Sequence, residues 1–228
     1  MGEAYDQIFT KGFLRENDDP NGRILVNSLG NSKMTPGQTK RMGSASPDWA
    51  GGLSNNLYWR GFSLSALIDM HMGGKVLSMT EAELATNGLS EQTLEGRDGM
   101  VVDGLKDDQD YDANPEGDPI WVENDIEVTE EDYRLSICGC CGPPGEPYFY
   151  DASYIRLREV LVGYTWNLKT PLIQSIGLSI YGRNLDFLHN PAGIIDPGMS
   201  MGAGNIQGVE GFSIPTSRTY GVNARFRF

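Results

Sequence analysis

The sequence closes on Tyr220-Gly221-Val222-Asn223-Ala224-Arg225-Phe226-Arg227-Phe228, and this stretch decides the fold. Its side chains alternate without a break. One face takes Tyr220, Val222, Ala224, Phe226 and Phe228, and the other takes Gly221, Asn223, Arg225 and Arg227. Alternation at period two predicts a β-strand. A soluble strand could show the same pattern by burying its apolar face, but free chain ends tend to fray. An aromatic-ended last strand is more typical of a transmembrane β-barrel, in which the last strand pairs with the first and leaves no edge.

A second alternating stretch runs from Phe62 to Met72. Its apolar positions fall on one face: Phe62, Leu64, Ala66, Ile68, Met70 and Met72. Asp69 and His71 are on the other face, where Leu67 is the one apolar exception. Eleven residues are about the length that a tilted strand needs to cross a bilayer. The stretch Trp49 to Arg60 predicts its hairpin partner, because Arg60-Gly61 leaves room only for a tight turn.

Two further strands are predicted near the C-terminus. Ser153 to Asn167 carries alternating apolar residues in its second half, and a turn around Lys169 follows. The next strand runs from Ile176 to about Leu188. Its alternation slips near Gly182, which predicts a β-bulge there. Residues 75–150 and 189–216 lack such a pattern, apart from a short helix expected near Thr80 to Thr86, and are expected to be long loops.

Composition excludes several classes of protein. The chain carries 31 acidic against 18 basic residues, a net charge of −13, which argues against nucleic-acid binding. No run of eighteen apolar residues occurs, so a transmembrane helix is excluded, although barrel strands never give such a run. Met1 to Asp6 has neither the basic nor the apolar part of a signal peptide. Either the protein is cytosolic or its natural N-terminus lies upstream. Since an outer-membrane protein must be secreted, we expect the second.

Several segments, in order along the chain, resemble motifs of the SusC/RagA family of TonB-linked outer-membrane proteins. The segment from Tyr150 to Val160, continued by Gly163-Tyr164-Thr165, resembles the signature of a late barrel strand. Arg183-Asn184-Leu185 is similar to the next strand, and Tyr220 to Phe228 to the terminal one. Upstream, Ser46 to Asn55 resembles the Asn-Pro-Asp and Gly-Gly-x-x-Asn block of the family. Glu95 to Gly99 fits a recurrent loop motif.

The resemblance implies an all-β fold: the C-terminal antiparallel strands of a transmembrane barrel of about 22 strands, with long extracellular loops. The expected division of residues 1–228 is a strand hairpin at 49–74, an extracellular loop at 75–150, a hairpin at 151–188, a loop at 189–216 and the closing strand at 217–228. The plug domain and signal peptide of the family have no counterpart in this chain.

The same resemblance implies a fragment of a TonB-dependent outer-membrane transporter that imports nutrients, oligosaccharides ahead of peptides. Its expected partners are a SusD-like surface lipoprotein, outer-membrane lipid, and the TonB complex through the missing N-terminal part. Tyr220, Val222, Ala224, Phe226 and Phe228 are expected to serve barrel closure and assembly. Asp69, His71, Arg225 and Arg227 are expected to face the lumen and to contact the plug.

Two local features invite a metal-site interpretation. Cys138, Cys140 and Cys141 crowd three thiols together, but the two histidines are far away in sequence and a zinc site usually needs four ligands. A loop disulfide fits a secreted protein better, and we assign the cluster no role. The segment Asp108 to Asn114, which overlaps the acidic cluster at 107–112, opens like a calcium loop, but Ala113 and Pro119 stand where the sixth-position Gly and the closing Glu are needed. A solvated loop is the favoured interpretation, with calcium left open.

No catalytic, cofactor or metal site is predicted. The chain has no Gly-x-Ser-x-Gly elbow, P-loop or His-Glu-x-x-His motif, so nothing supports an enzyme. Tyr148, Phe149, Tyr150 and Trp121 could stack on sugar rings, although packing within a loop or the membrane interface explains them as well. Two alternatives to the transporter stay open: a passive porin or adhesin barrel, and a soluble secreted β-sandwich that binds carbohydrate.

Overall fold

A computed structural model of the chain describes residues 6–109, 117–138, 145–168, 170–199, 207–214 and 216–228. Its strands and helices are β1 (Gln7–Thr10), β2 (Leu25–Val26), β3 (Lys40–Ser44), β4 (Trp49–Trp59), β5 (Phe62–Met72), β6 (Lys75–Ser78), α1 (Met79–Thr86), β7 (Met100–Val101), β8 (Leu105–Asp107), β9 (Trp121–Glu123), β10 (Glu127–Val128), α2 (Glu130–Cys138), β11 (Phe149–Asp151), β12 (Tyr154–Asn167), β13 (Ser175–His189), β14 (Val209–Glu210) and β15 (Thr219–Arg227). Single 3₁₀ turns are η1 (Glu16–Asp18), η2 (Glu91–Thr93), η3 (Glu146–Tyr148) and η4 (Pro197–Met199). None of the helices in the described ranges is long and apolar enough to cross a membrane.

The chain divides into two compact units. Unit 1 combines Met1–Ser44, Leu77–Phe149 and Val209–Phe212, and unit 2 combines Ala45–Val76, Tyr150–Gly208 and Ser213–Phe228. The chain passes between the units directly after β3, within β6, within β11 and on either side of β14. Each unit is therefore assembled from stretches that are far apart in the sequence.

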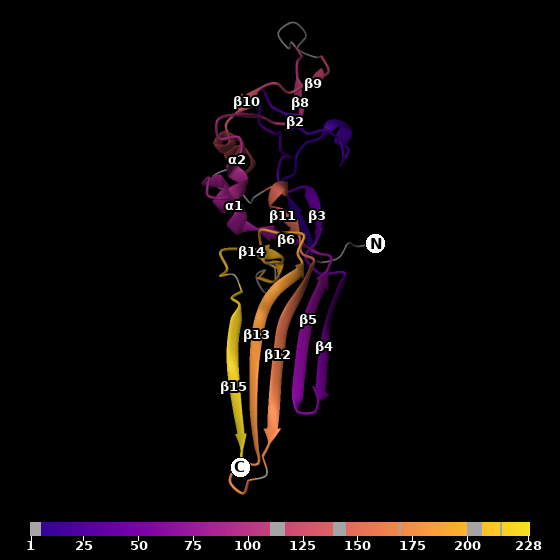
Figure 1. Cartoon of the computed structure of the whole chain (residues 1–228). Helices are drawn as coiled ribbons and strands as arrows, with labels where there is room; N and C mark the ends of the chain where they lie inside the picture. The colour runs from indigo at the N-terminus through magenta and orange to yellow at the C-terminus, as the bar shows by residue number, and fades with distance from the viewer. Residues whose placement is uncertain (1–5, 110–116, 139–144, 169, 200–206, 215) are drawn as a thin grey trace, which may run out of the picture. The chain divides into compact units, whose positions relative to one another are not determined.

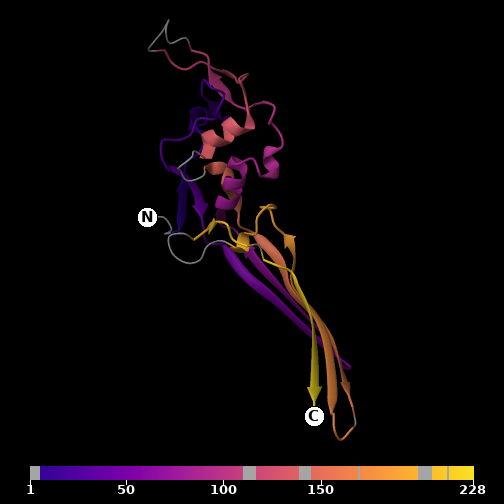
Figure 2. The same ribbon diagram turned by 90° about the vertical axis from the view of Figure 1, so that its left-hand side faces the viewer.

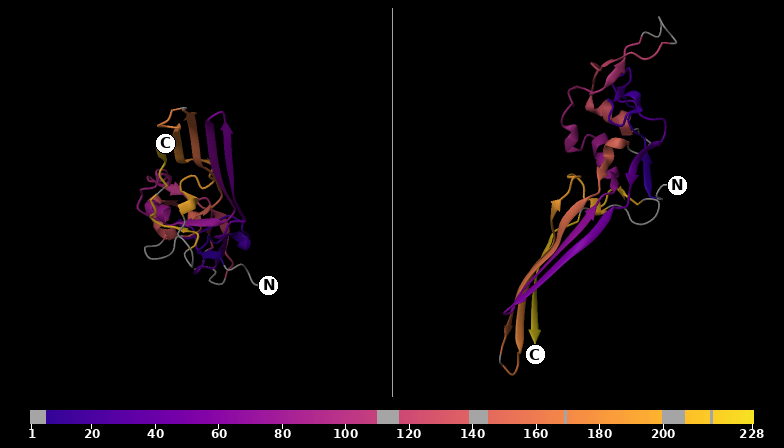
Figure 3. Two further views of the ribbon diagram at one scale, coloured as in Figure 1. Left: turned by 90° about the horizontal axis from the view of Figure 1, so that it is seen from below. Right: turned by 90° about the vertical axis from the view of Figure 1, so that its right-hand side faces the viewer.

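Unit 2 is built on one five-stranded antiparallel sheet in the order β15-β13-β12-β5-β4. Figure 1 shows these strands side by side, and Figure 2 shows them twisting together as the right-handed twist of individual strands requires. The long strands were all predicted from alternation, and β5 has the predicted bounds. The all-β expectation is confirmed. Within the described residues the sheet is open, with β4 and β15 at its two edges (Figure 3).

The tight turn predicted between β4 and β5 is observed at Arg60 and Gly61. Both residues have positive φ, 47° and 93°, as a two-residue hairpin of the type I′ kind requires. The carbonyl of Gly61 accepts a hydrogen bond from the backbone N–H of Thr165, 2.8 Å away. This bond ties the turn to β12, so a glycine here serves both the turn and the close approach of the next strand.

The irregularity predicted near Gly182 is observed two residues further on. The register between β12 and β13 shifts between Leu157 and Glu159, opposite a segment in which Asn184 has φ of 49°. The register of β12 against β5 shifts at the same place. Asn is among the few residues that adopt this left-handed conformation readily. The result is a bulge that turns Arg158 and Asn184 out of the regular alternation.

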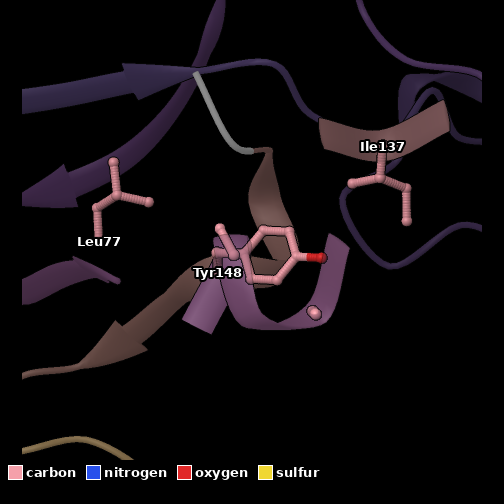
Figure 4. Close-up of a cluster of buried hydrophobic side chains, with 5 residues drawn as sticks. Leu77, Ile137 and Tyr148 are labelled. Atoms are coloured by element: carbon pink, nitrogen blue, oxygen red, sulfur yellow. The ribbon is translucent and has the colours of Figure 1, made fainter. Parts of the chain in front are cut away.

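Unit 1 shows that residues 75–150 are more than a long loop. They fold with the first 44 residues around two apolar clusters, one of Leu77, Ala82, Ala85, Ile137 and Tyr148 and one of Val26, Val102 and Val128. Figure 4 shows the Tyr148 ring between Leu77 and Ile137, which come from other elements. Local patterning did not indicate this core, because its members belong to short strands and helices that only tertiary contacts bring together.

Helix α1 of unit 1 begins at a buried cap. Ser78 accepts a hydrogen bond from the backbone N–H of Glu81, 3.0 Å away, and donates one to Glu210 Oε2, 2.7 Å away. Thr80 donates to the other carboxylate oxygen of Glu210 at 2.7 Å. Two residues of β14 also pair in parallel with Leu77 and Ser78. This explains why β14, remote in sequence, belongs to unit 1.

Glu146 fastens the N-terminal segment of unit 1. Its carboxylate lies 2.7 Å from Lys40 Nζ and 3.3 Å from Arg15 Nη2, and it accepts a hydrogen bond from the backbone N–H of Phe13 at 3.0 Å. Burial opposes ionisation, but the hydrogen bonds from Lys40 and Phe13 and the two cations outweigh it and hold the pKa of Glu146 below its usual range.

We expect Glu146→Gln to weaken unit 1 by about 2 kcal/mol, because charge-assisted hydrogen bonds are lost. A folded-state pKa below the unfolded value stabilises the folded form at pH above roughly 4.3, and this stabilisation is lost as the pH falls through the folded pKa. Hydrogen exchange of β1 and β3 amides measures both effects. Glu123→Gln removes an exposed carboxylate, paired with Arg23, and is expected to change exchange little. Equal effects of the two substitutions would contradict the role of Glu146.

Candidate functional site

The five-stranded sheet has one largely apolar face, here called the apolar face, on which Asn55 of β4, the partner of Ala66, is a polar exception. Cross-strand registers place on it Trp49, Leu53, Leu57 and Trp59 of β4, the six apolar residues Phe62 to Met72 of β5, Val160, Val162, Tyr164 and Trp166 of β12, Ile176, Leu178 and Ile180 of β13, and Tyr220, Val222, Ala224 and Phe226 of β15. Many are exposed in this chain, including Ile180 at 59% and Val222 at 69%. A patch of this extent needs an apolar environment to cover it.

Aromatic rings gather at one end of the apolar face. Trp59, Phe62, Tyr164 and Trp166 contact in sequence, with ring centroids 6.5, 4.5 and 4.7 Å apart. Phe226 follows in the same band, since it pairs with Ile176, which pairs with Trp166. Trp49 and Tyr220 lie toward the opposite end of their strands. Two separated groups of aromatics resemble the girdles that flank the lipid-facing band of outer-membrane barrels.

The opposite side of the sheet, here called the polar face, carries the residues predicted to face the lumen. Asp69 and His71 of β5 share this face with Arg225 and Arg227 of β15, as the registers through β12 and β13 show. The structure does not bring the four together. Arg227 pairs with Ser175, next to the connection between β12 and β13, whereas Asp69 pairs with Arg156 near the other end. They are therefore separate parts of one wall and form no single site.

Asp69 belongs to a polar cluster that the bulge creates. Arg158 donates to Asp69 Oδ2 from Nε at 2.9 Å and from Nη2 at 2.8 Å, and Tyr154 donates to the same oxygen at 3.3 Å. Nη1 of Arg158 donates to Asn184 Oδ1 at 3.3 Å. The ring of His71 stacks on Tyr154, with centroids 5.3 Å apart. This cluster can offer charged and aromatic groups to a polar molecule.

Another arginine on the polar face, Arg156, is almost completely buried. Arg156 is 2% exposed, its guanidinium lies 3.8 Å from the centroid of Phe187, and Nη2 is 2.5 Å from Asp196 Oδ1. Asp196 also accepts hydrogen bonds from Thr216 Oγ1 at 2.7 Å and from Gly198 N at 3.0 Å. Burial opposes ionisation, but Arg156 and Thr216 outweigh it and hold the pKa of Asp196 below its usual range.

Sequence reasoning missed Arg156, Arg158, Asn184 and Asp196 as site residues. The slip in alternation near Gly182 was a usable signal, because bulges often re-aim side chains at functional places. The pairing of Arg156 with Asp196 had no such signal, since 40 positions separate the two residues in the sequence. Of the aromatics considered for sugar stacking, Tyr148 is fully buried in the core of unit 1.

The two metal-site interpretations gain no support. No group of three or more potential metal ligands is found among the described residues. Cys140 and Cys141 lie outside those residues, as do Asp110 and Asp112, and Cys138 is the last residue of α2. The cysteine cluster therefore stays without an assigned role, and calcium binding by the acidic loop stays open.

Comparisons with known proteins agree with this architecture. No family model matches the chain. A TonB-dependent receptor, P3, of Formosa agariphila is 26% identical over 93% of this chain. Among solved structures, the RagAB peptide importer matches over 96% of the chain, with a TM-score of 0.56 in its open-open state at 17% identity and 0.52 in its closed-closed state at 18% identity.

The chain spans about a fifth of the length of these relatives: 20% of the receptor, and 21% and 22% of the two importer structures. The likeness to the importer extends over both units and shows the fold. The receptor of Formosa agariphila adds sequence similarity over 93% of the chain. Together these findings confirm the resemblance of this chain to SusC/RagA-type TonB-linked outer-membrane proteins, and its fold is that of a segment of their barrel.

Proposed function

We propose that this chain supplies five wall strands, and the connections between them, to an energy-coupled importer in the outer membrane. The observation that carries the proposal is the division of the sheet, across five paired strands, into a polar face and an opposite face on which apolar side chains predominate and Asn55 is a polar exception. Lipid covers an apolar band of this kind in outer-membrane barrels, and the opposite side lines the interior. The polar face is accordingly the inner wall, and Asp69, His71, Arg225 and Arg227 face the lumen and contact the plug.

The connections at the two ends of the sheet indicate which end faces the periplasm and which faces the outside of the cell. The Arg60-Gly61 turn, the connection between Asn167 and Ser175, and Arg227 of β15 lie at one end of the sheet. The long connections, including every stretch of unit 1, leave from the other end. Outer-membrane barrels have short periplasmic turns and long extracellular loops. We therefore infer that the residues of unit 1 are extracellular, where a SusD-like lipoprotein and the substrate approach.

The imported nutrient is proposed to be an oligosaccharide or a peptide. The oligosaccharide follows from the family resemblance. The peptide is supported by the structural neighbour RagAB, which is named a peptide importer. Neither the Asp69–Arg158 cluster nor the exposed acidic side chains of unit 1 favour one of the two. Closing residues Tyr220 to Phe228 are proposed to pair with the first barrel strand, as the open edge of β15 requires.

Uptake by living cells tests this function. A strain that lacks the gene for the full-length protein is expected to lose uptake of a labelled oligosaccharide pool or a labelled peptide pool, and the complemented strain to regain it. Disabling TonB in the complemented strain is expected to abolish uptake as fully as the deletion does. Uptake that persists without TonB would overturn the energy-coupled importer in favour of a passive porin. The pool that is affected identifies the substrate class.

A further inference from the structure

The first part of the connection between β13 and β15 lies on the polar face of the sheet. Tyr154 and Arg156 of β12 both lie on this face, since they pair with His71 and Asp69. Asp196 forms its ion pair with Arg156, and a side chain added at Gly198 would lie 3.7 Å from Tyr154 Oη. The segment from Asp196 to η4 thus contacts the polar side of β12. It does not cross to the apolar side.

Both ends of this connection are fixed. Asp196, on the outgoing part, accepts a hydrogen bond from Thr216, on the returning part. Asn190 Nδ2 donates to the carbonyl of Ile195 at 3.0 Å, and Asn184 Nδ2 donates to the carbonyl of Ser217 at 3.4 Å. Asp196 therefore links β12 to both parts of the connection at once. Its carboxylate is 11% exposed and the Arg156 side chain is 3% exposed, so solvent screens the pair little.

We propose that Arg156 and Asp196 hold the segment Asp196–Met199 inside the barrel mouth, where it narrows the opening and forms part of the surface that an entering oligosaccharide or peptide meets. This inference rests on the proposed function, because it takes the polar face as the inner wall. Arg156 is a positioning residue: it acts through Asp196 and is itself buried under Phe187 and the connection. Losing either partner leaves the other charge buried and unpaired, which strongly favours release of the segment.

Size-selective labelling in the full-length protein tests the placement. Ile194, two residues before Asp196, is 51% exposed and suits a reporter, Ile194→Cys. Labelling of the parent protein on intact cells gives the background from its own cysteines. If the segment lies inside the barrel mouth, the reporter thiol should react with a small maleimide at least about tenfold faster than with a 5-kDa polyethylene glycol maleimide. The reason is that a wide polymer is excluded from the barrel lumen. Equal rates would overturn the placement.

Releasing the ion pair tests the positioning role. Asp196→Asn keeps the side-chain shape and removes the charge, and it is expected to raise the rate of polymer labelling at least about tenfold. Thr216→Val removes one hydrogen bond and is expected to give a smaller increase. Arg218→Gln is the control, because its ion pair with Asp186 is exposed on both sides. An unchanged rate in Asp196→Asn and in Thr216→Val would overturn the proposal, as would an equal increase in the control.

The labelling test is independent of transport. Heat-dependent migration on gels shows that each variant has folded as a barrel before its labelling is compared. If uptake proves not to need TonB while labelling is size-selective, the proposed function fails and the placement of the segment stands. If uptake behaves as proposed and labelling is not size-selective, only the placement fails.

Discussion

Arginine at Ile180 is expected to destabilise the folded barrel by about 2–4 kcal/mol, whereas arginine at the next residue, Ser179, is expected to cost less than about 1 kcal/mol. Ile180 lies on the apolar face between Val162 and Val222, two rows from the aromatic end. A charge there has to be taken into hydrocarbon. Ser179 points to the polar face, where a guanidinium stays hydrated or finds a carboxylate.

Unfolding of the full-length protein from lipid vesicles by urea measures the two values. The substitutions share a strand, a side chain and nearly the same depth, so they differ mainly in the face that they modify. Equal destabilisation would mean that the apolar face is covered by protein and not by lipid. A larger effect at Ser179 would reverse the assignment of inner and outer walls.

Tyr148→Ala is expected to weaken unit 1 by about 3–5 kcal/mol, the range for truncating a large buried aromatic side chain. Tyr148 is 0% exposed and belongs to the cluster that joins β6, α1 and α2. Its removal leaves a cavity that short helices and two-residue strands cannot close without losing their contacts. The four-residue strands and helices of about two turns in unit 1 have little stability of their own.

Hydrogen exchange of the α1 and α2 amides measures this loss. Tyr148→Phe keeps the ring and removes only the hydroxyl, and it is expected to retain most of the protection. Leu29→Ala truncates a side chain that is 70% exposed in the same unit and serves as the control. If α1 and α2 exchange as slowly in Tyr148→Ala as in Leu29→Ala, the cluster is not what holds unit 1 together. Exchange in β12 and β13 of unit 2 is expected to stay unchanged.

The sequence alone predicted most of the sheet, for a physical reason. A strand between lipid and lumen must alternate, so Phe62 to Met72 and Tyr220 to Phe228 carry their orientation in their own residues. The tight turn between β4 and β5 could be predicted because Arg60-Gly61 lies between two stretches of alternating residues. The β-bulge was also visible in the sequence, because the alternation of apolar residues changes register between Ile180 and Leu185. Patterns of this kind are local and need no knowledge of the rest of the fold.

Only the tertiary structure decided the parts whose partners lie far apart in the sequence. The apolar cluster of unit 1 includes Leu77, Ile137 and Tyr148, which come from segments with no marked periodicity. Their burial therefore results from tertiary packing and could not be predicted from a local sequence pattern. The carboxylate of Glu146 reaches Lys40 across more than a hundred positions, and Asp196 reaches Arg156 from a connection without regular structure. Alternation in Tyr220 to Phe228 fixed which side of the wall is apolar. Long-range ion pairs and packing, which no short stretch encodes, fixed what folds against the other side.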